Sequence, residues 1–177
     1  MKKNSKEERK ASYERRIFRE FADAALSQAK LEIDLKSIVS EAPPKPDISC
    51  AIGTQKHHFE MTEITDENLA KRVSISQRDL VMTGGASSQD GPLIRAFTNK
   101  SQQTYADLDG PLELLAYYDK QYPPPPKGIQ KATLNQLYWV AQEMVVFGPW
   151  SRLWIYDTWN KRIIWLAEST QLKQCPA

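Results

Sequence analysis

Three carboxylates stand in or beside two short apolar segments in the first third of the chain. Asp47 follows a proline at the start of the first segment, and Glu60 and Glu63 lie within the second. Removing an unpaired carboxylate from water costs on the order of several kcal/mol. A fold keeps acidic side chains in such positions when a cation, a metal ion or a reaction needs them. These residues are therefore the first candidates for a functional site.

The two segments, 45–53 and 59–64, are predicted to form a β-hairpin. Residues 53–56 between them have the length and the composition of a tight turn. Side chains alternate along each strand, and residues opposite each other in an antiparallel pair share a face. The hairpin is therefore expected to bring two carboxylates close together.

The register decides which carboxylates meet. A two-residue turn at Thr54-Gln55 would place Asp47 opposite Thr62, with Glu60 on the same face. One further turn residue would place Asp47 opposite Glu63 instead. We favour the first register, because it keeps the apolar residues of the second strand together on the other face.

A resemblance to a known family rests on these residues. Pro46-Asp47 followed by Glu60-Met61-Thr62 resembles the motif of the PD-(D/E)XK nuclease superfamily, with Thr62 where the pattern has lysine. The stretches PDISC…FEMTEITDENLAKR, GPLELLAYYD and WSRLWIYD are similar to a group of uncharacterised bacterial proteins that are suspected members of it. The similarity covers roughly residues 12–165. It implies an α/β fold of the restriction-endonuclease-like type, with a mixed central sheet flanked by helices.

The resemblance also implies a divalent-metal site and a reaction. Asp47, Glu60 and Glu14 are the expected ligands of Mg²⁺ or Mn²⁺, which are hard cations that prefer oxygen ligands. The metal would activate water and neutralise phosphate charge during hydrolysis of nucleic acid. A nuclease-like protein that has lost catalysis and serves as a binding or regulatory module is the alternative, and the threonine at Thr62 is its main support.

Glu14 enters this set from the first predicted helix. Apolar residues recur at three- and four-residue spacing over residues 12–36, and Glu14 falls on or beside that apolar stripe. Members of the superfamily often supply one acidic ligand from this helix. The other interpretation is a surface ion pair between Glu14 and Arg15, Arg16 or Arg19, worth less than about 1 kcal/mol.

The lysine of the motif needs a substitute if the site is active. Its ammonium would steady the attacking water and the charge that develops on phosphate, which Thr62 cannot do. Lys71 follows the second strand by about one helical turn and is the preferred candidate, with Lys56 and Lys100 as alternatives. Gln103 shares the predicted helix of Lys100 and is a weaker candidate for the same site.

Composition indicates one compact domain. The chain has 177 residues, of which 41% are hydrophobic and 26% charged, and this is long enough to build a core. We expect a basic arm at 1–11, a single domain at 12–168 and a tail at 169–177. The predicted order is helix, strand, strand, helix, helix, strand, helix, strand, strand. The elements after the first hairpin are helices at 65–80, 93–107 and 129–147, a central strand at 111–118, and a hairpin of strands 150–156 and 161–166.

Several classes of protein are not supported. The two cysteines, Cys50 and Cys175, form no CxxC or zinc spacing, and no secretory signal or membrane-length apolar run is present. A cytoplasmic protein that does not enter membranes is expected. The loop 83–92 lacks the ending of a phosphate-binding P-loop. His57 and His58 are interpreted as turn residues, since two histidines are too few for a histidine-based site.

Two features point to partners. The first nineteen residues carry eight Lys and Arg against three Glu, a net charge of +5 that leaves the remainder near −3. This stretch would contact phosphate or form a solvated helix start. The aromatic hairpin 150–166 would stack on bases or form a protein or homo-oligomer interface, or its rings would pack within the domain.

Overall fold

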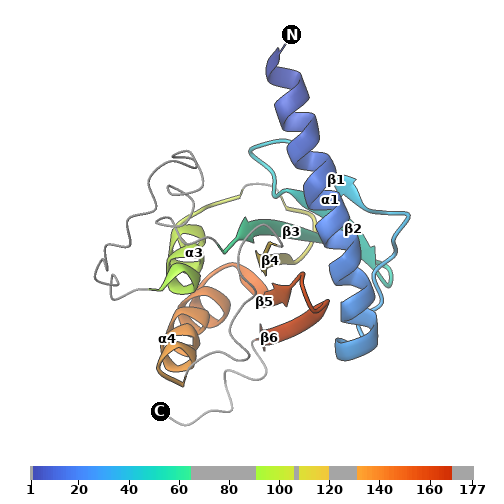
Figure 1. Cartoon of the computed structure of the whole chain (residues 1–177). Coiled ribbons are helices and arrows are strands. Elements are labelled where there is room, and N and C mark those ends of the chain that lie inside the picture. The colour runs from blue at the N-terminus through green and yellow to red at the C-terminus, as the bar shows by residue number, and fades with distance from the viewer. Residues whose placement is uncertain (1, 65–90, 106–107, 120–130, 169–177) are drawn as a thin grey trace.

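A six-stranded mixed sheet separates helix α1 (Lys2–Ala29) on one face from α3 (Pro92–Ser101) and α4 (Lys131–Ala141) on the other (Figure 1). The structure is a computed structural model and describes residues 2–64, 91–105, 108–119 and 131–168. Helix α4 continues directly into the π-helical segment η1 (Gln142–Phe147). The expectation of a mixed α/β fold with helices on both faces of a sheet is confirmed.

The strands follow one another across the sheet in chain order. They are β1 (Val39–Ser40), β2 (Ile48–Ile52), β3 (Gln55–Glu63), β4 (Leu112–Tyr118), β5 (Trp150–Asp157) and β6 (Arg162–Glu168). β1, β2 and β3 form an antiparallel meander, β3, β4 and β5 are parallel, and β6 returns antiparallel to β5. The parallel pairing of β3 with β4 agrees with the helical crossover expected between them.

Helix α1 is held against the sheet by an aromatic cluster. Phe18 lies edge-on to Phe59 of β3 with ring centroids 4.8 Å apart, and Phe21 lies 5.3 Å from Trp154 of β5. These rings are almost fully buried, and such pairs stabilise a core beyond their area alone. Glu14 stands one helical turn before Phe18, so this packing also fixes where the Glu14 carboxylate lies.

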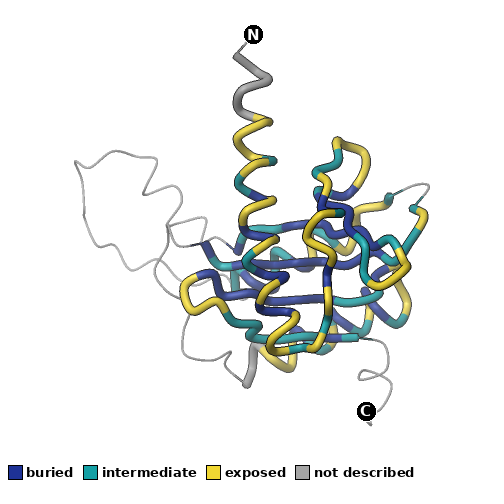
Figure 2. Tube along the Cα trace, turned by 90° about the vertical axis from the view of Figure 1, so that its right-hand side faces the viewer, coloured by how far each residue is buried: buried dark blue, intermediate teal, exposed yellow. Residues whose placement is uncertain are grey.

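The ends of α1 differ from the predicted helix at 12–36. The helix begins at Lys2, so the predicted basic arm forms its first turns, which project beyond the sheet (Figures 1 and 2). It ends at Ala29 because Lys30 adopts a positive φ of 57°, and the Leu31 amide donates to the Ala25 carbonyl. This left-handed residue closes the helix in the way a C-terminal glycine commonly does.

The second core lies on the opposite face of the sheet. Leu93 and Phe97 of α3 pack there together with Leu137 of α4 against Leu114 of β4. Helix α3 ends at Ser101, earlier than the predicted end at residue 107. Figure 2 shows how the buried residues concentrate in the strands and in the part of α1 that lies over them.

The turn of the first hairpin is placed differently from the prediction. Ile52 pairs with Gln55 and Ile48 with Phe59, so the turn consists of Gly53 and Thr54. Gly53 has a φ of +60°, which glycine adopts without steric cost. Both predicted registers are therefore wrong. The shift from the favoured one is two residues, so every side chain keeps its predicted face.

The aromatic residues of the C-terminal hairpin divide into two groups. Trp150, Trp154 and Tyr156 are buried in the domain, so packing accounts for them. Trp159 is 43% exposed and Trp165 is half-buried. Only these two keep ring surface that a partner could reach.

Several predictions fall on parts of the chain outside the described residues. These are the helix at 65–80 with Lys71, most of the loop 83–92, the proline-rich connection at 122–126 and the tail at 169–177. Among the helices that are described, none combines the length and apolar character needed to cross a membrane.

Candidate functional site

Asp47 stands where the chain enters β2. Its Oδ2 accepts a hydrogen bond of 2.9 Å from the Met61 amide of β3, and its Oδ1 lies 3.4 Å from the Lys10 ammonium of α1. Continuing the hairpin register by one step puts Asp47 level with Glu60. The side chain thus links the start of β2 to both the sheet and the first helix.

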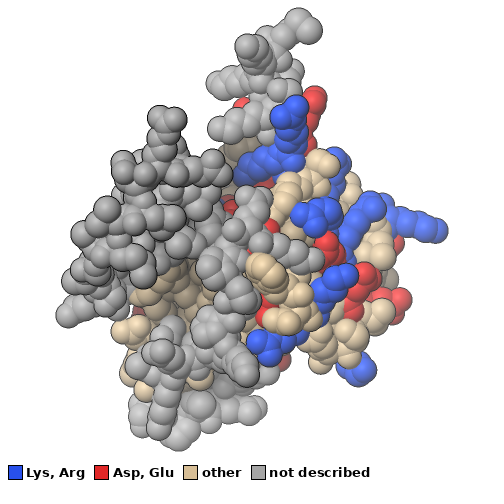
Figure 3. All heavy atoms as spheres, in the orientation of Figure 1, with Lys and Arg blue, Asp and Glu red and all other residues tan. Residues whose placement is uncertain are grey.

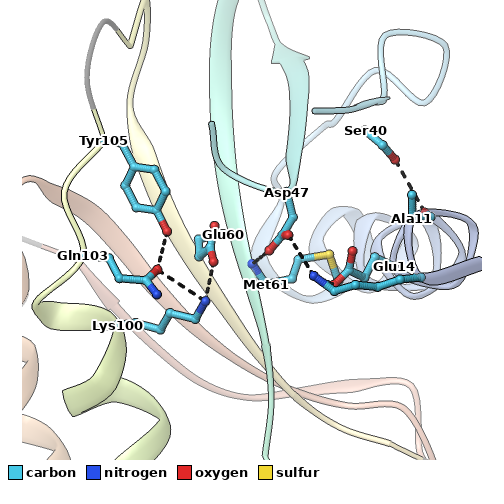
Figure 4. A network of polar contacts seen from close by, with 10 residues as sticks. Ala11, Glu14, Ser40, Asp47, Glu60, Met61, Lys100, Gln103 and Tyr105 are labelled. Carbon is cyan, nitrogen blue, oxygen red and sulfur yellow. Dashed lines mark hydrogen bonds and ion pairs between the residues drawn. The ribbon is translucent and has the colours of Figure 1, made fainter. Parts of the chain in front are cut away.

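Glu60 lies in the middle of β3 on the face that carries α3. Its carboxylate accepts a hydrogen bond from the Lys100 ammonium near the end of α3. The same ammonium is 3.4 Å from Gln103 Oε1, which also accepts a 2.6 Å hydrogen bond from the Tyr105 hydroxyl. Figure 4 shows Lys100, Gln103 and Tyr105 approaching Glu60 from the side of α3. The buried carboxylate therefore has a cationic partner that a second pair of side chains orients.

Glu14 of α1 is the third predicted carboxylate. Its Oε1 is 3.2 Å from the ammonium of Lys10, one turn earlier on the same helix. Lys10 therefore lies between Glu14 and Asp47 and neutralises both. The alternative partners Arg15, Arg16 and Arg19 are wrong for Glu14.

Asp47 and Glu60 both act electrostatically on Glu14. Burial raises the pKa of Glu14, and the charges of Asp47 and Glu60 raise it further, while Lys10 opposes the shift. Burial and the nearby Glu60 charge also raise the pKa of the Tyr105 hydroxyl, which therefore stays protonated and donates. Each of the three carboxylates is paired with a lysine, Lys10 or Lys100.

Thr62, at the position where the motif has lysine, lies beside Lys100. It follows Glu60 on the same face of β3, and Thr62 and Lys100 line one small hollow together with Asn99 of α3. Lys56 pairs instead with Asp109 at 3.1 Å, before β4. Lys71 lies outside the described residues. Of the three predicted lysines, Lys100 is the one that the described structure brings to the site.

Glu63 does not belong to this group. It sits one residue beyond Thr62 and so lies on the α1 face of β3, where burial and the charge of Asp119 raise its pKa. Glu63 also lines the hollow beside Thr62 and Lys100, but Glu60 is the acidic residue of β3 that contacts the Lys100 ammonium.

Sequence reasoning missed Lys10 as a partner of the site. The detectable signal was its spacing of four residues before Glu14, which places the two side chains on one side of a helix. Tyr105 gave no such signal, because it reaches Gln103 from the chain that follows α3.

The two histidines are not turn residues, which corrects the prediction. His57 and His58 are buried within β3, because the turn closes earlier, at Gly53-Thr54. His58 Nε2 lies 2.7 Å from Asp109 Oδ1. The hydrogen bonds that Asp109 receives from His58 and Lys56 lower the pKa of the Asp109 carboxyl to about 2.

A second polar group, also missed, is buried under α1. Glu113 of β4 is fully buried and receives His57 Nδ1 at 2.7 Å, the Arg152 guanidinium at 2.6 Å and the Trp154 indole at 2.7 Å. A lone carboxylate in an otherwise apolar strand was the available signal. These partners satisfy both oxygens of Glu113, so its role is to join β3, β4 and β5.

The carboxylates match a hard divalent cation in chemistry. Glu14, Asp47 and Glu60 offer oxygen ligands of the kind that Mg²⁺ and Mn²⁺ prefer. In the described part of the chain, however, no three His, Cys, Asp or Glu side chains are grouped so that they could hold a metal ion as they are placed. Lys10 and Lys100 supply the positive charge there.

Comparisons with protein-family models, with curated proteins and with solved structures give no match to this chain. The geometry of the site therefore carries the functional assignment.

Proposed function

We propose that the protein is a divalent-metal-dependent nuclease with a restriction-endonuclease-like fold, and that Lys100 replaces the lysine absent at Thr62. The observation that supports this most is the contact between the Lys100 ammonium and the Glu60 carboxylate, beside Thr62. An antiparallel meander that leads into a parallel strand supplies the acidic residues in the order that the resemblance implies.

The roles follow from the chemistry of each side chain. Glu14, Asp47 and Glu60 would hold Mg²⁺ or Mn²⁺, which supplies a Lewis acid for the phosphoryl oxygens and lowers the pKa of water. Lys100 would donate hydrogen bonds to the charge that develops on phosphate during hydrolysis. Gln103 limits where the ammonium can lie, since its Oε1 is held by the Tyr105 hydroxyl.

Lys10 has a different part in this scheme. Its side chain is 67% exposed, so it can leave Glu14 and Asp47 with little loss of packing. The exposed ammonium would act as a replaceable counter-ion for these two carboxylates. Entry of the metal then exchanges one cation for another.

A second candidate is a nuclease-like module without catalysis. The two lysine pairs favour it, because Lys10 and Lys100 already neutralise the carboxylates without a metal. The two candidates differ in a measurable property: the nuclease binds a divalent cation at these residues and the inactive module does not.

Cleavage of plasmid DNA, single-stranded DNA and RNA in Mg²⁺ or Mn²⁺ tests the proposal. We expect the wild type to cut at least one of them. Glu60→Gln and Lys100→Met should each lower the rate about 10²- to 10³-fold, as loss of a charge-stabilising group typically does. Lys36→Met removes an exposed lysine elsewhere and should leave the rate unchanged. A wild type that cuts none of the three substrates, or a Lys100→Met variant with full activity, would refute the proposal.

A further inference from the structure

Positive charge is concentrated on one segment of α1. Between Arg9 and Arg19 five of the eleven residues are basic, and the single acidic residue is Glu14, which is buried and paired with Lys10. The whole chain has a net charge of +2. This one segment therefore exceeds the net charge of the protein, and the rest of the chain is slightly acidic.

The arginines of this segment point away from the sheet. Arg9, Arg15, Arg16 and Arg19 are all exposed, and the helical period places Arg9 and Arg16 opposite Phe18, with Arg15 and Arg19 on the flank of the helix. Figure 3 shows basic side chains, with acidic ones among them, on the side of the molecule that α1 covers. The packing of α1 on the sheet thus buries Glu14 and leaves the four arginines of this segment exposed.

Most of these guanidinium groups have no acidic partner in the described part of the chain. Arg16 lies 3.0 Å from Glu20 and stacks over the Tyr13 ring at 4.9 Å. The described residues give Arg9, Arg15 and Arg19 no ion pair. Within the described part of the chain, no ion pair therefore competes with an external anion for these three arginines.

The arrangement suits an extended polyanion. Arg15 and Arg19 are one helical turn apart, which is about 6 Å along the axis, and Arg9 stands roughly 9 Å before Arg15. The helical period puts Arg15 and Arg19 together on one side of the helix and Arg9 with Arg16 on another, so the guanidinium groups form two pairs on α1. Arg15, Arg16 and Arg19 also line a shallow hollow with Ser12 and Ile38, and the acidic side chains of Glu20 and Asp23 border the same hollow. Guanidinium groups bind phosphate oxygens in bidentate geometry, and two such pairs can hold different phosphates of one backbone.

A membrane surface fits this face less well. An interfacial helix needs large apolar side chains next to its basic ones so that they can enter the lipid. The exposed face between Arg9 and Arg19 has none, and Leu26 is the first large apolar residue of α1 that is exposed. The chemistry of the face therefore favours a charged and hydrated backbone as its partner.

We propose that the exposed face formed by Arg9, Arg15, Arg16 and Arg19 of α1 binds the phosphodiester backbone of nucleic acid without reading its sequence. This inference rests on the proposed function and names how the substrate is held. The helix that supplies Glu14 to the site would then also anchor the strand near it. Contacts of this kind position a nucleic acid and make its affinity strongly dependent on salt.

Binding of a fluorescein-labelled DNA duplex of mixed sequence, and of one of its single strands, tests this by fluorescence anisotropy. The full chain is used in EDTA, so that binding is measured without metal or cleavage. The test variant is the triple substitution Arg9→Ala, Arg15→Ala and Arg19→Ala, which keeps a good helix former at each position. The matched control replaces the exposed lysines Lys36, Lys45 and Lys161 by alanine and changes the net charge equally.

We expect the arginine variant to bind at least tenfold more weakly at about 100 mM salt, with the slope of log Kd against log salt reduced by about 2 to 3. The lysine control should change affinity less than about threefold, since its residues lie elsewhere. Equal losses in both variants, or a wild type that binds neither probe, would overturn the inference. A third contradicting result concerns anionic lipid vesicles. The inference fails if the wild type binds these vesicles, and if the arginine substitutions abolish this lipid binding but leave DNA binding unchanged.

The two proposals can fail separately. If the arginine variant binds DNA as the wild type does and still cleaves it in Mg²⁺, the inference is refuted and the proposed nuclease activity stands. If the protein binds DNA in EDTA through the arginines but cleaves no substrate, the inference stands and the proposed nuclease activity is refuted.

Discussion

At the scale of single residues, two lysines decide how the carboxylate group behaves. Lys100 is partly buried, bonds to Glu60 and is oriented through Gln103. Lys10 is exposed and bridges Glu14 and Asp47 at the longer distances of 3.2 and 3.4 Å. The contrast separates a cation that is fixed in the site from one that can be displaced. In the proposed nuclease the two lysines would therefore have different roles, since only a fixed ammonium can orient a phosphate.

The raised pKa of Glu14 predicts how metal affinity depends on pH. A carboxyl binds metal only when it is ionised, and here protonation persists above the ordinary pKa of 4.5 because of burial and the nearby acids. Affinity for Mn²⁺ should therefore rise with pH through a window that begins above pH 4.5. Glu14→Gln should bind more weakly and lose most of that dependence. Isothermal titration between about pH 5 and pH 7.5 measures this, and identical pH profiles for the two proteins would contradict it.

The same shift has a consequence for stability. The folded state holds the Glu14 proton more tightly than the unfolded state does. Protonation of Glu14 therefore contributes to the free energy of unfolding below the ordinary pKa, and this contribution is lost as pH rises through the raised pKa of the folded state. Binding of metal would reverse this loss, because it favours the ionised carboxyl.

Glu113 predicts the largest effect of a single charge on stability. Replacing it by glutamine leaves the partly buried Arg152 guanidinium without its counter-charge, and breaking a fully buried pair typically costs about 3–5 kcal/mol, which is the upper limit here. We expect Glu113→Gln to lower the free energy of unfolding by up to this amount in urea denaturation. The exposed Glu32→Gln should change it by less than about 0.5 kcal/mol. A Glu113→Gln protein as stable as the control would show that the network contributes nothing.

At the scale of the elements, the site depends on how β3 meets the chain that enters β4. The His58 amide donates to the Pro111 carbonyl at 2.8 Å, and Asp109 bonds to both Lys56 and His58. Gly110 passes so close to β3 that a Cβ there would lie 1.8 Å from the Lys56 carbonyl oxygen. This close approach sets the start of β4 and, through the parallel pairing, the position of Glu60.

A methyl group at Gly110 tests that contact. Its neighbour is backbone and cannot rotate away, so β3 or the entry to β4 must shift. We expect Gly110→Ala to destabilise the protein by about 2–4 kcal/mol. Gly91→Ala is the matched control, since nothing lies within 4 Å of the added Cβ. It should cost at most about 1 kcal/mol. Urea denaturation of both variants gives the comparison, and equal stabilities would show that the approach is looser than described.

At the scale of the whole molecule, the sequence predicts the layers better than the contacts between them. Alternation in β3 and the helical period around Phe18 gave the faces of both elements correctly, because burial depends on patterns within one segment. The hairpin turn was misplaced because Gly53-Thr54 and Thr54-Gln55 are both plausible turns locally. Lys100 was one of three open choices, since only the packing of α3 on β3 brings it to Glu60. The Glu113 network likewise joins three strands that are far apart in the chain.

The central claim is that Glu14, Asp47 and Glu60 form a site for a divalent cation, and titration of Mn²⁺ followed by calorimetry tests it most directly. The claim predicts that the wild type binds one Mn²⁺ ion saturably. In Asp47→Asn the affinity should be at least tenfold lower, which corresponds to about 1.4 kcal/mol. The control Glu32→Gln should bind as the wild type does. Absence of saturable binding by the wild type, or equal affinity in Asp47→Asn, would contradict the claim and leave the lysine-neutralised module as the better description.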